Sequence, residues 1–172
     1  LLQHDENAPL ASRLGRPLFI ILPVYVSLTG IGVLAMLVGG QGVFDALTLT
    51  MSSLSTTGFI NDSTASPASM NMTSQTVISL LTLTGALSLP LVMSLTRGRY
   101  KQLNAEVELR VFILLIIGFA LVSWLVLPSG LVASLLQAIS LSTTAGFAFL
   151  DSAELAGWPM VWIMVPSLIG GM

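Results

Sequence analysis

The sequence contains no cysteine, and its single histidine, His4, lies outside every apolar segment. Without cysteine the chain can form neither a disulfide framework nor a thiolate metal site, and one isolated histidine leaves metal and redox chemistry without their usual ligands. Charged residues are also scarce, at 8% of the 172 residues, whereas a soluble domain carries about 25%. The formal net charge is −2, so no basic stripe is present to neutralise phosphates, and nucleic-acid binding is excluded.

Apolar sequence is abundant: 54% of the residues are hydrophobic and the mean hydropathy is +0.92. A helix needs roughly 20 apolar residues to cross a hydrocarbon core about 30 Å thick. Four segments reach or approach that length, at about 17–40, 75–95, 111–127 and from 158 onward. We therefore predict an all-α integral membrane protein surrounded by a lipid bilayer. The chain begins with Leu1 and stops at Met172 within an apolar run, which we interpret as a piece of a longer polypeptide.

The basic residues indicate which side of the membrane each connection faces. All six lie before the first apolar segment or between the second and the third (Arg13, Arg16, Arg97, Arg99, Lys101 and Arg110). Residues 1–16 and 97–110 should therefore be cytoplasmic by the positive-inside rule. Residues 60–74 and 148–157 carry acidic but no basic side chains and should face outward. This assignment requires the two short stretches between the spans to dip into the membrane and leave by the same face.

A polar motif occurs once in each short stretch, as SSLSTTGF at residues 52–59 and as SLSTTAGF at residues 140–147. Gly58 and Gly146 are 88 residues apart, whereas LSTT aligns at a spacing of 87, so Ala145 either replaces a threonine or is inserted. We predict two tandem helix, pore-loop, helix repeats of parallel topology. The predicted segments are a cytoplasmic N-terminal segment (1–16), a first repeat (17–96), a cytoplasmic basic connection (97–110) and a second repeat truncated in its inner helix (111–172).

The chemistry of the motif depends on its depth in the membrane. Non-helical backbone there must be buried in protein or line water, because an unsatisfied peptide group in lipid costs several kcal/mol. A cation satisfies such carbonyls when they replace its hydration shell. We expect Gly58 and Gly146 to supply the unusual dihedral angles, and Phe59 and Phe147 to wedge the outer end of each loop between helices. The threonine hydroxyls should brace neighbouring carbonyls or contribute an oxygen (Thr56, Thr57, Thr143 and Thr144).

A short pore helix should precede each motif, at about residues 42–53 and 130–141, with Ser129 as the N-cap of the second. The C-terminal end of each helix would point at the pore. That end carries roughly half a negative elementary charge, which favours a cation in front of it.

These motifs resemble the Trk/Ktr/HKT superfamily of potassium transporters, and most of all its bacterial Trk membrane subunit. FDALTLTMSSLSTTGF is similar to the family's second pore loop, RGRYKQLNAEVELR to its cytoplasmic connection before the third repeat, and VPSLIGGM to the start of the glycine-rich interruption in the third repeat's inner helix. The resemblance implies potassium uptake through four such repeats in one polypeptide, of which this chain would be the second and third. It also implies a homodimer, a cytoplasmic nucleotide-binding regulatory subunit and a location in the inner (plasma) membrane.

By the same resemblance, the selectivity filter comprises the backbone of both loops and the phenylalanine at the end of each (Ser55, Thr56, Thr57, Gly58, Phe59, Thr143, Thr144, Ala145, Gly146 and Phe147). The potassium ion would be held by six carbonyl oxygens (those of Thr56, Thr57, Gly58, Thr144, Ala145 and Gly146). A glycine in each loop is the pattern that the family associates with potassium, whereas serine is associated with sodium permeation in plant members. Potassium is the cargo, and no cofactor is implied.

The last apolar segment carries a predicted gate. Pro166 removes a backbone donor, and Gly170 and Gly171 loosen the chain just after it, so this helix should break within the membrane. The resemblance implies that an intramembrane gating loop continues from this break. A proline kink with glycines for helix packing is the alternative.

Catalysis is not expected. No His, Lys, Asp or Glu lies at the predicted membrane depth near Ser55 or Ser142 to activate a nucleophile, and the acidic residues after the motifs belong to outer loops (Asp62, Asp151 and Glu154). A non-conducting membrane scaffold or packing subunit, whose small residues serve helix packing, stays open as the alternative. It does not explain two Gly-Phe turns, each preceded by threonines at a matching depth. We therefore predict a transporter and not an enzyme.

Overall fold

The computed structural model describes residues 10–61, 66–87, 107–126, 130–150 and 165–166. These residues form helices and connecting loops, with no strand among them. The elements in chain order are α1 (Leu10–Val38), α2 (Val43–Leu54), the short 3-10 helix η1 (Pro67–Ser69), α3 (Met72–Gly85), α6 (Val107–Val126) and α7 (Leu131–Ser142). The predicted all-α fold class is confirmed.

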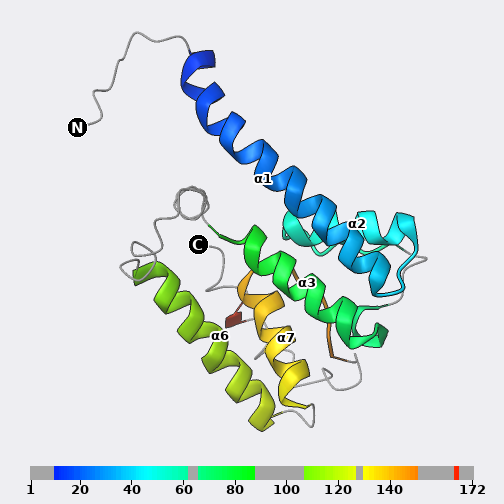
Figure 1. The fold of residues 1–172 in the computed structure, drawn as a ribbon. Coiled ribbons are helices and arrows are strands. Elements are labelled where there is room, and N and C mark those ends of the chain that lie inside the picture. Colours follow the sequence, from blue (N-terminus) through cyan, green and yellow to red (C-terminus); the bar gives the residue numbers. More distant parts are fainter. Residues whose placement is uncertain (1–9, 62–65, 88–106, 127–129, 151–164, 167–172) are drawn as a thin grey trace.

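The helices form two groups that meet at α3 (Figure 1). In the first group α1, α2 and α3 pack on one another, and in the second α6 packs along α7. Because α3 also contacts α7, it joins the two groups, and the loops that follow the two short helices, α2 and α7, lie against each other. The sites predicted from the two halves of the sequence therefore lie close together.

The predicted apolar spans correspond to helices only in part within the described residues: α1 ends at Val38, and α3 ends at Gly85, ten residues before the predicted end of the second span. Within the described residues, one helix is long and apolar enough to cross a membrane by length and composition, at Ile21–Val38 in α1. Shorter apolar helices occur at Val43–Leu54, Leu109–Leu125 and Leu131–Ser142. The second predicted span begins within α3, and its part beyond residue 87 lies outside the described residues, as does most of the fourth.

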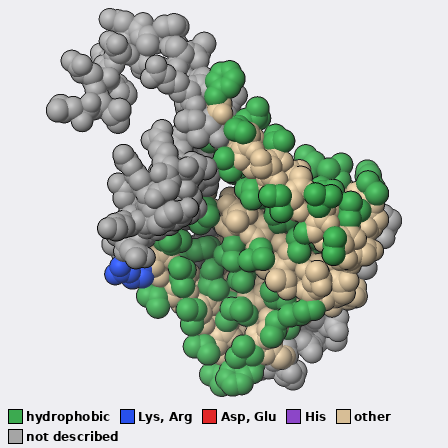
Figure 2. Space-filling view, in the orientation of Figure 1, with side chains coloured by type: hydrophobic (Ala, Val, Ile, Leu, Met, Phe, Trp, Pro, Cys, Tyr) green, Lys and Arg blue, Asp and Glu red, His purple; other side chains and the backbone are tan. Residues whose placement is uncertain are grey.

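Large apolar side chains cover the outward faces of the helices (Figure 2). On α1 they are Phe19, Leu22, Val26, Ile31, Leu34 and Val38, and on α6 they are Ile113, Leu114, Ile117, Leu121, Trp124 and Leu125. A monomeric soluble protein rarely exposes a continuous apolar surface of this kind, which marks a face that contacts protein or lipid.

The buried core draws on both groups of helices. Its members come from α1, α2, the segment before α3, α3, α7 and the segment after α7 (Met36, Ala46, Leu49, Met70, Ile78, Leu136, Ala145, Phe147 and Phe149). Two of them, Ala145 and Phe147, belong to the second polar motif. That loop is therefore part of the core of the described structure.

Glycines let α2 lie tightly between α1 and α3. A Cβ at Gly32 of α1 would stand 2.6 Å from Cγ2 of Thr50, and a Cβ at Gly85 of α3 would stand 2.2 Å from the carbonyl oxygen of Leu54. Any larger residue at Gly85 would thus push against the backbone at the end of α2. The close contact between Gly85 and Leu54, the last residue of α2, holds the backbone in place where the first loop begins.

Amide side chains fasten the connection between α2 and α3. Nε2 of Gln75 donates to three carbonyl oxygens of this connection, those of Pro67, Ala68 and Met70, at 3.0, 3.2 and 3.0 Å. Asn71 caps α3 by accepting from the Ser74 N–H at 2.9 Å, and its Nδ2 donates to the Gly39 carbonyl at 2.6 Å. The end of α1 and the start of α3 are held together in this way.

Candidate functional site: two matching helix-to-loop turns

The helices that lead into the two motifs have the same length and the same ends. Each has 12 residues, and the N-cap residues, Gly42 and Gly130, have φ/ψ angles of −62°/156° and −64°/155°. Neither N-cap residue makes a side-chain capping hydrogen bond. The expectation that Ser129 caps the second helix is wrong, because Gly130 occupies the N-cap position and the helix begins at Leu131.

The chain leaves both helices through the same turn. Thr56 and Thr144, with φ of 51° and 57°, are left-handed, and so are Gly58 and Gly146, with φ of 67° and 75°. The left-handed residue after the last helical turn, with its two characteristic hydrogen bonds, defines a Schellman motif. The bonds of the first turn run from Thr56 N to Ser53 O (3.2 Å) and from Thr57 N to Ser52 O (3.0 Å); those of the second run from Thr144 N to Leu141 O (3.0 Å) and from Ala145 N to Ser140 O (3.0 Å).

The left-handed threonines were not anticipated from the sequence. The glycines have the expected unusual dihedral angles, but Thr56 and Thr144 adopt positive φ as well. A residue with a Cβ pays roughly 1–2 kcal/mol for this conformation, and backbone strain of this kind is often found at functional sites. A tandem Thr-Thr at a predicted helix end was the only signal, and no glycine marked it.

The hydrogen bonds decide the register that the sequence left open. Each bond of the second turn joins residues 88 positions after those of the first. Ala145 therefore occupies the position of Thr57, as a substitution, and the alternative of an inserted alanine is wrong. The apparent spacing of 87 arose because Ser-Thr-Thr occurs in both motifs one position out of register.

Hydroxyl groups brace the ends of the helices, though not all of them as expected. Ser55 Oγ donates to the Met51 carbonyl at 2.8 Å and shares a 2.5 Å hydrogen bond with Thr57 Oγ1, in which either atom can be the donor. The equivalent Thr143 Oγ1 donates to the Ile139 carbonyl at 2.9 Å. Among the described residues, neither the Thr56 nor the Thr144 hydroxyl makes a hydrogen bond, so the bracing role holds for Thr57 and Thr143 only.

The carbonyl groups of both turns take no part in the hydrogen bonding of the described residues. No hydrogen bond among the described residues ends at a carbonyl oxygen of residues 55–58 or 143–146. The described residues also contain no group of three or more His, Cys, Asp or Glu that could hold a metal ion. The oxygen atoms that these loops can offer a cation are therefore those of the backbone and of the hydroxyl side chains.

The two loops touch. The carbonyl oxygen of Ala145 lies 1.8 Å from the point where a Cβ on Gly58 would stand. Such an approach is possible only for glycine, since real Cβ contacts are essentially never shorter than 3.0 Å. At Gly146, in contrast, nothing lies within 4 Å of an added Cβ. Gly58 of the first loop thus packs against the backbone of the second loop, whereas there is free space around the equivalent Gly146.

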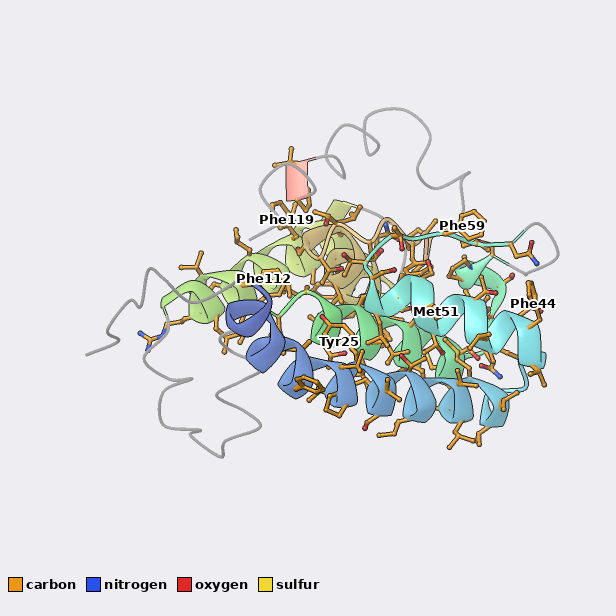
Figure 3. The ribbon with its side chains drawn as sticks, turned by 90° about the horizontal axis from the view of Figure 1, so that it is seen from above. Tyr25, Phe44, Met51, Phe59, Phe112 and Phe119 are labelled. Carbon is orange, nitrogen blue, oxygen red and sulfur yellow. The ribbon has the colours of Figure 1, made fainter. Side chains whose placement is uncertain are left out.

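The phenylalanines directly after the two glycines have opposite environments. Phe147 is fully buried, with its ring centroid 6.5 Å from that of Phe149. Phe59 is 65% exposed and lies on the α2 side of the molecule with Phe44 and Met51 (Figure 3). The prediction that both rings wedge between helices holds for Phe147 and is wrong for Phe59.

Two polar residues behind the second loop were missed in the sequence. The Phe149 N–H donates to Gln137 Oε1 at 2.7 Å, and Ser140 Oγ donates to the Phe147 carbonyl at 2.9 Å. Both polar side chains are buried on α7. The available signal was a single glutamine in an otherwise apolar or small-residue helix, where a buried amide must find a partner.

The predicted gate lies mostly outside the described residues. Val165 and Pro166 are helical, and Pro166 is buried. Gly170 and Gly171 fall within residues 167–172, which the structure does not describe.

Comparison with known proteins identified no relative: no protein-family model matches the chain, and neither a curated protein nor a solved structure matches it. The assignment of a function therefore depends on the residues and on the geometry of the two turns.

Proposed function

We propose that this chain forms part of a membrane pore that takes up potassium ions through a selectivity filter of backbone carbonyls. The observation that carries the proposal is the pair of matching turns, whose carbonyl oxygens at residues 55–58 and 143–146 accept no hydrogen bond among the described residues. Carbonyls without partners are costly at membrane depth. An ion that exchanges its hydration water for them removes that cost and is itself stabilised.

The geometry of the helices supports a cation over an anion. α2 and α7 both end immediately before their loops, and a helix C-terminus carries roughly half a negative elementary charge. In the mechanism we propose, potassium loses water in front of these helix ends and passes between carbonyl oxygens. Gly58 and Gly146 keep the loops in the required conformation. No bond is made or broken, and no cofactor takes part.

The membrane setting draws its support from the apolar outward faces of α1 and α6 and from the span at Ile21–Val38. In the proposed arrangement α2 and α7 are re-entrant pore helices of two helix, pore-loop, helix repeats in the plasma membrane. Residues 1–16 and 97–110 would face the cytoplasm. The family resemblance of the motifs adds the further proposals of two more repeats in the same polypeptide, a homodimer, a nucleotide-binding regulatory subunit and a gate at Pro166, Gly170 and Gly171.

The proposal is tested by potassium uptake. The complete reading frame that contains this chain should restore the growth of uptake-deficient cells at low external potassium. Gly146→Ser should weaken discrimination against sodium, because it strains the left-handed backbone of the loop without a clash against a neighbouring segment. Gly30→Ser is the matched control, since Gly30 also has nothing within 4 Å but lies in the middle of α1.

Two results would contradict the proposal. The first is that wild-type protein, present in the membrane, gives no potassium-dependent growth, which is the result expected for a scaffold. The second is that Gly146→Ser and Gly30→Ser leave the same selectivity as the wild type.

A further inference from the structure

A buried glutamine stands directly behind the second loop. Gln137 lies in the middle of α7 with 3% of its surface exposed, and its Oε1 accepts the backbone N–H of Phe149 at 2.7 Å. Phe149 is itself only 4% exposed. A buried hydrogen bond of this kind is costly to leave unmade, because the N–H would have no water to turn to.

A second hydrogen bond reinforces the first. Ser140, three residues further along α7, is fully buried, and its Oγ donates to the Phe147 carbonyl at 2.9 Å. Residues three apart share a face of a helix. The same face of α7 thus binds two backbone groups of the chain that leaves the second loop, the Phe149 N–H and the Phe147 carbonyl. Both hydrogen bonds are buried in the protein interior, and a hydrogen bond is stronger there than in water.

The first loop has neither of these contacts, although its turn is otherwise the same. Leu49, an apolar residue, stands at the position equivalent to Gln137, 88 residues earlier. Ser52, the equivalent of Ser140, is buried, and its Oγ has no hydrogen-bond partner among the described residues. Beyond the turn, Phe59 is exposed where Phe147 is buried. The two loops are therefore alike where the helix ends and different where the chain leaves.

We infer that Gln137 is a positioning residue that holds the second loop rigid and thereby sets the ion selectivity of the pore, while the first loop adapts to it. This inference rests on the proposed function. Fixing residues 147–149 from behind fixes the carbonyl of Ala145, which in turn bears on Gly58. Carbonyls that cannot move inward coordinate the smaller sodium ion poorly, so the hydrogen bond to Gln137 favours potassium.

The test replaces Gln137 with methionine in the complete polypeptide, which keeps the length of the side chain and removes the acceptor. We expect the amide hydrogens of residues 147–150 to exchange about fivefold to tenfold faster, and the sodium-to-potassium permeability ratio in proteoliposomes to rise about fivefold. Both factors follow from the net contribution of one hydrogen bond, about 1 kcal/mol, which corresponds to a change of about fivefold in an equilibrium constant. The matched control is Leu49→Met, which makes a volume-conserving change at the equivalent buried position and should alter neither quantity.

Two further variants separate positioning from general damage. Gln137→Glu keeps an acceptor at the same reach and should restore most of the protection and selectivity. Ser140→Ala is a smaller change and should move both quantities in the same direction as Gln137→Met, so it takes over the test if the methionine variant does not fold.

The inference is overturned if residues 147–150 exchange at the wild-type rate in Gln137→Met. It is also overturned if exchange accelerates while the permeability ratio stays unchanged, or if Leu49→Met has the same effects. A wild-type protein that transports no potassium would instead refute the proposed function itself. Transport by the wild type with equal selectivity in the variant would refute only the role of Gln137.

Discussion

The contact between the two loops leads to a quantitative prediction about their glycines. Gly58 and Gly146 have the same left-handed conformation, with φ of 67° and 75°, so an alanine at either position costs roughly 1–2 kcal/mol in backbone strain. At Gly146 this is the whole cost, because nothing lies within 4 Å of the new methyl group. At Gly58 the methyl group would stand 1.8 Å from the Ala145 carbonyl oxygen, whereas ordinary contact begins at 3.4 Å.

Relief of that overlap requires the loops to separate, since the opposing atom belongs to backbone and has no rotamer to change. Overpacking of a tight site costs about 1–3 kcal/mol, and sometimes more. Gly58→Ala should therefore lower the free energy of unfolding by about 2 kcal/mol more than Gly146→Ala. Gly58→Ala should also have the larger effect on ion selectivity, because it displaces a carbonyl that we propose to bind the ion.

The assay is chemical unfolding of the detergent-solubilised protein, followed by circular dichroism, alongside ion competition in proteoliposomes. Gly30→Ala provides the control, since Gly30 is helical and has open space around it, and alanine should stabilise a helix interior by up to about 1 kcal/mol. Equal destabilisation by Gly58→Ala and Gly146→Ala would show that the loops are not in contact at this point, and the reasoning would be refuted.

Three further predictions concern the same region. Thr144→Gly should stabilise the protein by about 1 kcal/mol in a thermal-unfolding measurement, because the residue is left-handed and its hydroxyl has no hydrogen-bond partner among the described residues; an unchanged or lower Tm would contradict the turn geometry. Ala145→Thr should cost about 1–3 kcal/mol, because Ala145 is buried. The reverse change at the exposed equivalent, Thr57→Ala, removes an exposed hydrogen bond with Ser55 Oγ and a long one (3.5 Å) to the Ser52 carbonyl and should cost less than about 1 kcal/mol; similar losses in both would argue against the 88-residue equivalence. Since the sequence has no cysteine, Phe59→Cys should react rapidly with a membrane-impermeant thiol reagent added from outside, and Phe147→Cys should react much more slowly; fast reaction of Phe59→Cys from the cytoplasmic side only would refute the proposed topology.

The sequence was sufficient to predict the features that depend on local patterns. Apolar runs of the right length predicted helices, and the polar ends of the two short runs predicted loops that begin near Ser55 and Thr143, where α2 and α7 end. The glycines in these loops have the unusual dihedral angles that their position suggested. Such features are determined by residue type and neighbouring residues, which a sequence displays directly.

The features that could not be predicted depend on contacts and backbone geometry that residue type and local pattern do not reveal. The register of Ala145 was ambiguous because Ser-Thr-Thr can be aligned in two ways, and only the backbone hydrogen bonds distinguish them. The environments of Phe59 and Phe147 differ because one loop enters the core and the other lies at its edge, although both residues directly follow a glycine of the motif. The role of Gln137 depends on a residue 12 positions further along the chain.

The close fit of Gly58 against Ala145 has an evolutionary consequence. Loops far apart in a sequence ordinarily accumulate substitutions separately, yet here a side chain gained at residue 58 collides with the main chain of residue 145. A larger residue at position 58 is therefore tolerated only if the backbone at Ala145 has first moved away from it. In proteins descended from this one, Gly58 and the conformation of the loop at Ala145 should therefore change together or both be retained.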